Sequence, residues 1–135
     1  MNSDLLERPI LTPTDLYQYW QELMHPLGFT ERRLYIVFLD ADRRAVPVLH
    51  EISGVPLHPT SEDAESLLAL LAHFGDEFAF AILLARPGDN HMNDDDRAWP
   101  RLLAEASARF EVELEPLHLA TDSALLPFAP DDLVA

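Results

Sequence analysis

The stretch from Phe78 to Ala85 (FAFAILLA) constrains the fold more than any other part of the sequence. All eight of its residues are apolar. A short run that is apolar on both faces is typical of a strand inside a sheet that is covered on both sides. Eight residues are too few to cross a membrane as a helix. The run from Leu34 to Asp40 (LYIVFLD) has nearly the same character and predicts a second buried strand.

Amphipathic segments that surround these runs predict three helices. The first is expected to begin after Thr12, because Pro13 suits the first helical position and Asp15 completes a capping box. Apolar residues then recur at helical spacing. A second helix is expected to begin with Thr60 or Ser61 as its cap. A third is expected after Asn93, where three aspartates would lie at the positive end of the helix dipole.

Two further strands are predicted on either side of the central run. The segment from Ala45 to Ile52 (AVPVLHEI) follows a short polar turn, so it should form a hairpin with the strand that begins at Leu34. Pro47 has no backbone N–H, which indicates an edge strand or a bulge. The segment from Glu111 to Ala120 (EVELEPLHLA) predicts a last strand with a bulge at its proline. The tail after it should pack over the core as coil or a short helix.

The predicted order of elements is α-β-β-α-β-α-β. Helices that alternate with buried strands indicate an α/β fold in three layers, with a mixed sheet flanked by helices. Residues 1–11 are expected to form a flexible lead-in and residues 12–135 a single domain. An apolar content of 48% fits a globular chain of 135 residues.

The charged residues exclude several kinds of chemistry. All nine basic residues are Arg, so a Schiff-base enzyme and the usual P-loop NTPase are excluded, and the absence of Cys excludes thiolate catalysis and Cys-ligated metals. A net charge of -15 argues against direct binding of a nucleic-acid backbone. We expect a cytoplasmic protein without membrane contact, since no signal peptide or membrane span is evident.

The element order and several local strings resemble the RadC-like branch of the JAMM/MPN metalloprotease fold. The resemblance covers residues 11–133 and implies a JAMM/MPN-like, cytidine-deaminase-like order of elements. It is carried by the strings LTPTDLYQYW, RRLYIVFLDADRR, LHEISGVPLHPTSEDAESLLALL, FAILLARPGDNHMNDDDRAWPRLL and EVELEPLHLA.

The resemblance also implies where a metal loop would lie. Members of this family hold zinc with two His of a His-x-His-Pro motif and the Asp of a Ser-x-x-Asp motif. When Pro87 is matched to the Pro of the first motif, Leu84 and Arg86 stand where the two His should be. Asn93 then matches the Ser of the second motif and Asp96 matches its Asp, with a deletion of one residue.

The resemblance implies the scaffold without the activity. The glutamate that polarises the zinc-bound water in the family corresponds to Arg32, with Glu31 one residue away. Two of the three metal ligands are therefore replaced, and one carboxylate does not hold a catalytic zinc, which needs about three protein ligands. We expect no catalytic residue, no metal and no cofactor.

The first functional hypothesis is a non-catalytic RadC-like domain that acts through protein–protein interaction, with a protein partner or a second copy of itself. The apolar tail from Ala124 to Leu133 and the strand that contains Pro47 are the expected contact surfaces. The alternative is a metal-dependent hydrolase with a rebuilt site at Asp89, His91 and Asp96. A further alternative is an acidic mimic of DNA, with its carboxylates in rows on one face.

Two other groups of residues are candidate binding or catalytic sites. Arg86, Asp89 and Arg97, next to His91, could contact a small anion or a peptide, or Arg97 could instead form ion pairs with the aspartates that begin the third helix. The neighbouring His50 and Glu51 could act as a base and its orienting group, but adjacent strand residues point to opposite faces. His58 lies in the loop that follows them.

Overall fold

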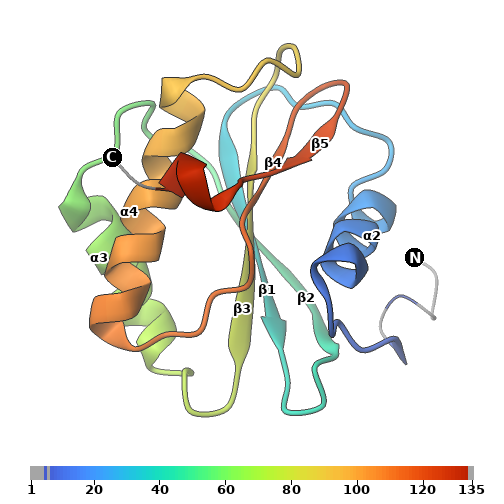
Figure 1. The fold of residues 1–135 in the computed structure, drawn as a ribbon, viewed down its shortest axis with the longest axis vertical. Coiled ribbons are helices and arrows are strands. Elements are labelled where there is room, and N and C mark those ends of the chain that lie inside the picture. Colours follow the sequence, from blue (N-terminus) through green and yellow to red (C-terminus); the bar gives the residue numbers. More distant parts are fainter. Residues whose placement is uncertain (1–4, 6, 134–135) are drawn as a thin grey trace.

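The protein has a mixed α/β fold (Figure 1). The structure, a computed structural model, describes residues 5 and 7–133. Its elements in chain order are α2 (Pro13–Leu23), β1 (Arg33–Leu39), β2 (Ala45–Ile52), α3 (Ser61–Ala72), β3 (Ala79–Ala85), α4 (Asp94–Phe110), β4 (His118–Ala120), β5 (Leu125–Pro127) and the 3₁₀ helix η1 (Pro130–Leu133). In this described part of the chain, no helix has the length and apolar character needed to cross a membrane.

The strands form one five-stranded sheet in the order β2-β1-β3-β4-β5. β1 is antiparallel to both β2 and β3, β3 is parallel to β4, and β4 is antiparallel to β5. The predicted hairpin is confirmed, and Pro47 lies on an edge strand as predicted. Since β2, β3 and β4 run in the same direction, their carboxyl ends meet at one edge of the sheet.

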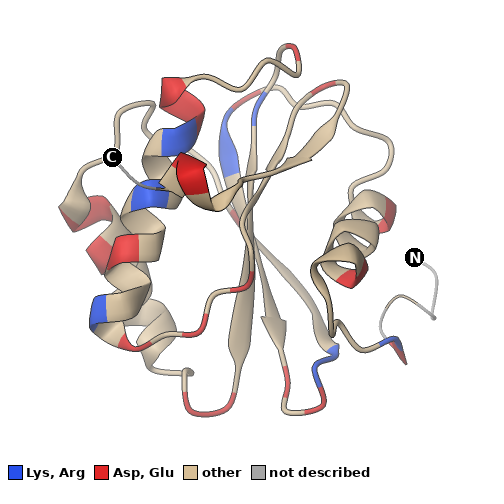
Figure 2. Ribbon diagram, viewed as in Figure 1, with Lys and Arg blue, Asp and Glu red and all other residues tan. Residues whose placement is uncertain are grey.

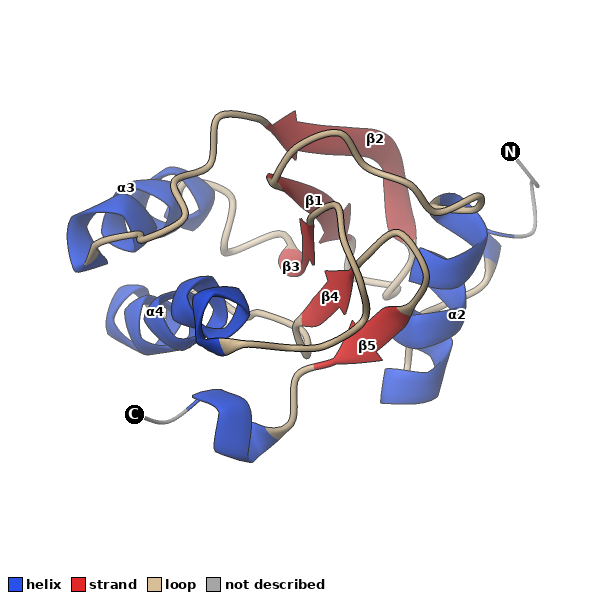
Figure 3. Cartoon of the chain, turned by 90° about the horizontal axis from the view of Figure 1, so that it is seen from above, coloured by secondary structure: helices blue, strands red, loops and turns tan. Residues whose placement is uncertain are grey.

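Helices cover the sheet on both faces, as Figure 3 shows. α2 packs on one face, where Trp20 and Leu83 lie in its core, and α3 and α4 pack on the other, where Leu68 and Leu103 are buried. Every residue of β3 is buried, so the prediction of a central strand with two apolar faces is confirmed.

All three predicted helix starts are correct. Thr12, Thr60 and Asn93 are the N-caps, and each forms a capping box with the Asp three residues later. The first helix ends earlier than its apolar periodicity suggests, at Leu23. Proline disfavours helix in the residue before it, and Pro26 lies just beyond this end.

The prediction of one strand from Glu111 to Ala120 is wrong. Glu111 takes a left-handed conformation (φ 54°) and ends α4, only an isolated bridge joins Leu114 to Phe80, and β4 itself has three residues. Pro116 separates the bridge from β4, because proline cannot donate a ladder hydrogen bond. The tail then adds β5, a strand that the sequence pattern did not indicate.

Both ends of the described chain contact the core. Leu5 and Ile10 from the lead-in are buried beside α2, and the backbone N–H of Ile10 donates to the carbonyl of Arg43 at 2.7 Å. Residues 1–4 and 6, to which the predicted flexible lead-in also extends, lie outside the described residues. In the tail, Leu125 and Phe128 are buried, so much of its apolar surface faces the core rather than a partner.

Candidate functional site

The loop that the resemblance assigns to the metal lies at the edge where β2, β3 and β4 end. Arg86 directly follows β3, and Asp96 lies in the first turn of α4, which begins after the loop. Arg32 directly precedes β1, and Asp122 follows β4 by two residues. Topology thus brings four polar residues from distant parts of the sequence to one edge of the sheet.

Arg86 is the centre of this loop. Its side chain is 9% exposed. Its guanidinium donates two parallel hydrogen bonds to Asp96, from Nε to Oδ1 at 2.6 Å and from Nη2 to Oδ2 at 2.8 Å. Nη1 donates to the carbonyls of Pro87 (3.1 Å) and Asp89 (3.0 Å), and Nη2 also donates to that of His91 (3.1 Å). A guanidinium has five N–H groups, so Arg86 is fully satisfied from within the protein.

Asp96 is equally well satisfied. It is completely buried, and its two oxygens each accept one hydrogen bond from Arg86, while Oδ2 also accepts the backbone N–H of Asn93 (3.0 Å). Burial opposes ionisation, but the hydrogen bonds from Arg86 and Asn93 outweigh it and lower the pKa of Asp96. The hydrogen bond to Asp96 in turn raises the pKa of Arg86. At neutral pH the pair is an ionised, bidentate salt bridge.

Some of the positions that the resemblance links to zinc lie close together in the structure. Arg32, which stands at the glutamate position, places Nη2 3.5 Å from Oδ1 of Asp96. Leu84 is 2% exposed and packs in the core beneath α3 and α4. Of the two histidine positions, one is therefore occupied by core packing and the other by the guanidinium that binds Asp96.

Asp89, His91 and Asp96 do not bring their side chains together. Asp89 Oδ1 accepts the backbone N–H of His91 at 3.0 Å, and both side chains belong to exposed residues. Asp89 and His91 contact the centre of the loop through their backbone carbonyls, which accept hydrogen bonds from Arg86. In the described part of the chain, no three His, Asp or Glu side chains are grouped so that they could hold a metal ion.

Arg97 belongs to a different set of contacts. Its Nε donates to Asp132 at 2.9 Å and its Nη1 lies 3.4 Å from Asp94, so it joins α4 to η1. The hydrogen bond to Asp132 raises the pKa of Arg97. The contact with Asp94 is the ion-pair alternative proposed from the sequence, and the partners of Arg97, Asp94 and Asp132, differ from those of Arg86.

Asp122 is a residue of this edge that the sequence analysis did not identify. Its carboxylate accepts the backbone N–H groups of Gly88 (2.8 Å) and Phe29 (2.9 Å), and these bonds lower its pKa. Its own N–H donates to the carbonyl of Gly88 at 3.2 Å. Asp122 therefore fastens the Arg86 loop to the loop before β1. The sequence does contain a signal for this residue, because it is a carboxylate that closely follows a strand whose carboxyl end lies at this edge.

The three histidine and glutamate candidates near β2 do not form a joint site. His50 stacks on Phe38 with ring centres 4.9 Å apart, whereas Glu51 pairs with Arg33 at 3.2 Å on the other face of the sheet. His58 is highly exposed and lies 3.4 Å from Asp95. The expectation that His50 and Glu51 point apart is confirmed.

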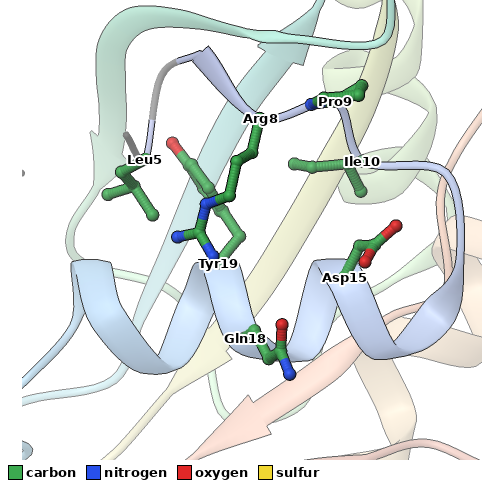
Figure 4. A pocket seen from close by; sticks show the side chains of 7 residues that line it. All are labelled: Leu5, Arg8, Pro9, Ile10, Asp15, Gln18 and Tyr19. Atoms are coloured by element: carbon green, nitrogen blue, oxygen red, sulfur yellow. The ribbon is translucent and has the colours of Figure 1, made fainter. Parts of the chain in front are cut away.

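Several hollows of the described structure lie away from the Arg86 loop. One of about 410 Å³ lies between α2 and β5, and another of about 190 Å³ lies between α3, α4 and the end of β2. A further one of about 280 Å³ lies between the β1–β2 turn and the turn before β3. The smallest of these holds about 30 Å³, roughly one water molecule. It lies between the lead-in and α2 (Figure 4), lined by Leu5, Arg8, Pro9, Ile10, Asp15, Gln18 and Tyr19.

The acidic residues are spread over the molecule. Figure 2 shows them on α2, α3 and α4, in the turns at both ends of the sheet and in the C-terminal segment. A mimic of DNA would need them in rows on one face, so this distribution gives that alternative no support.

No protein-family model matches the chain, and no curated protein matches it.

Proposed function

We propose that the chain is a non-catalytic RadC-like domain that acts by binding another protein chain. The observation that carries this proposal is the buried, bidentate salt bridge between Arg86 and Asp96. In the family that the sequence resembles, the position of Asp96 supplies a zinc ligand and the position of Arg86 supplies another.

Two features of the fold support the RadC-like part of the proposal. The described elements from α2 to β4 run in the order α-β-β-α-β-α-β, which is the order on which the resemblance was based. Three positions that the resemblance links to zinc, namely Arg32, Arg86 and Asp96, lie within one contact network although they come from different elements.

The chemistry of this network supports a role without catalysis. A carboxylate that coordinates zinc must offer a lone pair to the metal. Asp96 already accepts three N–H groups, and Arg32 adds a second positive charge nearby. Metal binding would have to break these bonds and leave a buried guanidinium without its counter-ion, which is strongly unfavourable.

A measurement of metal content tests this proposal. We expect purified, untagged protein to contain no stoichiometric zinc and to show no rise in melting temperature when zinc is added. The variant His91→Ala tests the rebuilt hydrolase site, and His73→Ala is a matched control because His73 is exposed at the end of α3. Stoichiometric zinc that is lost in His91→Ala but kept in His73→Ala would overturn the proposal.

A further inference from the structure

β2 is an edge strand, and its side that faces away from β1 is open. It is the first strand in the sheet order and pairs only with β1 among the described strands. All residues from Pro47 to Ile52 are exposed. Figure 3 shows the strand at the margin of the sheet, with both helical layers lying to its inner side. An open edge of this kind presents backbone groups that can pair with another strand.

The exposed side chains of β2 are unusually apolar for a surface. Val48 is 50% exposed, Leu49 40% and Ile52 36%. Leu49 lies opposite Val37 and Ile52 opposite Leu34, residues that belong to the cores on opposite faces of the sheet. A strand added beside β2 would therefore cover apolar surface on both faces.

The apolar surface continues from β2 toward α3. His50 stacks on Phe38, and Phe38 contacts Phe74, with ring centres 5.6 Å apart. Phe74 is 44% exposed, and Leu70, one helical turn earlier, is 59% exposed. Exposed apolar side chains on β2 and near the end of α3 that are linked through Phe38 are candidates for an interaction surface.

The charges on β2 are suited to self-association. The chain carries a net charge of -15, so two copies repel each other except where their surfaces are locally neutral. β2 has one acidic residue, Glu51, which is paired with Arg33. Arg44 lies just before the strand and forms no ion pair with a described residue within 4.0 Å. Arg44, whose Nε donates to the carbonyl of Glu7 at 2.8 Å, therefore lies before the beginning of β2, and the carboxylate of Glu51, which Arg33 also binds, lies near its end.

We propose that β2 pairs antiparallel with β2 of a second copy of this chain, about a two-fold axis near Val48. This proposal rests on the proposed binding function and names its partner. The antiparallel arrangement places Arg44 of each copy near Glu51 of the other, and it joins the two sheets into one. A parallel arrangement would instead place like charges together.

Pro47 limits the extent of the pairing. It has no N–H to donate, and it lies in the irregular segment of β2 between Ala45 and Leu49. The ladder therefore depends mainly on the exposed segment from Val48 to Ile52 and on the apolar side chains around it. A short ladder of this kind gives a reversible dimer whose population depends on protein concentration.

Analytical ultracentrifugation over a range of concentrations tests the dimer. We expect the wild-type chain to associate, and Leu49→Lys to raise the dissociation constant by at least about tenfold, because it places like charges close together at the axis. Phe110→Lys is the matched control, since Phe110 is similarly exposed (36%) at the far end of α4. Circular dichroism confirms that both variants are folded.

A charge exchange tests the orientation of the strands. Arg44→Glu alone and Glu51→Arg alone should each weaken the dimer, and the double variant should recover part of the loss. A parallel pairing predicts no such recovery. If the double variant is no stronger than either single variant, the antiparallel arrangement is wrong.

Crosslinking locates the axis, because the natural chain has no cysteine. The variant Val48→Cys should form a covalent dimer under mild oxidation much faster than the variant Phe110→Cys. If the chain dimerises but the cysteine at Val48 reacts no faster, another surface forms the dimer and the proposal falls. A chain that stays monomeric at every concentration also overturns it. That result would not bear on the non-catalytic assignment, which the measurement of zinc content tests separately.

Discussion

The substitution Asp96→Asn isolates the energetic role of the salt bridge at the Arg86 loop. Asp96 caps α4 and binds Arg86, so its loss affects both interactions. The same helix-capping position in α3 is occupied by Asp63, which forms an identical capping box with Thr60 and has no ion-pair partner among the described residues. Asp63→Asn is therefore a control for the capping contribution alone.

The expected magnitudes of the two substitutions differ clearly. Removal of one partner of a buried ion pair costs about 3–5 kcal/mol, because the remaining charge is left buried without compensation. A change in a helix cap costs about 0.5–2 kcal/mol. Because the capping contribution is common to both variants, we expect Asp96→Asn to lower the free energy of unfolding by about 3–5 kcal/mol more than Asp63→Asn does. This is a large part of the roughly 5–15 kcal/mol that stabilises a typical domain.

Urea denaturation followed by circular dichroism and tryptophan fluorescence measures this difference. Trp99 is a suitable local probe, since it lies one turn after Asp96 and its Nε1–H donates to the carbonyl of Pro56 at 3.1 Å. Equal losses in Asp96→Asn and Asp63→Asn would refute the inference that the salt bridge stabilises the loop.

Acid titration of stability provides a second readout. The pKa of Asp96 is lowered in the folded state from its ordinary value of 3.8, so the folded state favours the ionised carboxylate. This stabilisation is present above pH 3.8 and is lost as the pH falls through the lower folded-state pKa. The wild-type protein should lose this contribution below pH 3.8, whereas Asp96→Asn should lack that part of the pH dependence. An unchanged acid-unfolding curve would contradict the assignment.

Three further predictions follow from buried or hydrogen-bonded side chains. Leu68→Ala should lower the free energy of unfolding by about 2–5 kcal/mol, while Leu70→Ala, on the exposed face of the same helix, should change it by less than about 0.5 kcal/mol in urea denaturation. Asp122→Ala should speed amide exchange at Gly88, measured by hydrogen exchange, because this N–H loses its acceptor. Burial raises the pKa of Tyr19 to about 12, so ultraviolet titration should show one tyrosine that ionises well above pH 10, and its stabilising contribution should be lost as the pH rises from 10 to 12.

Much of the fold could be predicted because its elements depend on local patterns. The capping boxes at Thr12, Thr60 and Asn93 mark helix starts within four residues of chain, and strand β3 is apolar on both faces. The last strand could not be predicted correctly, because its length depends on how Pro116 interrupts the pairing beside Phe80. A local pattern does not contain that pairing.

The sequence by itself determined the α/β class, the three helix starts and the β1–β2 hairpin, since each depends on backbone preferences within a few residues. For Pro47 it left an edge strand and a bulge open, and the order of the strands decided for the edge. The tertiary structure decided the state of the candidate site. From sequence, Asp96 is one of three similar aspartates at a helix start, yet it is fully buried on Arg86, whereas the side chain of Asp94 is 95% exposed. That difference arises because the loop folds back and places a guanidinium from the end of β3 against the first turn of α4.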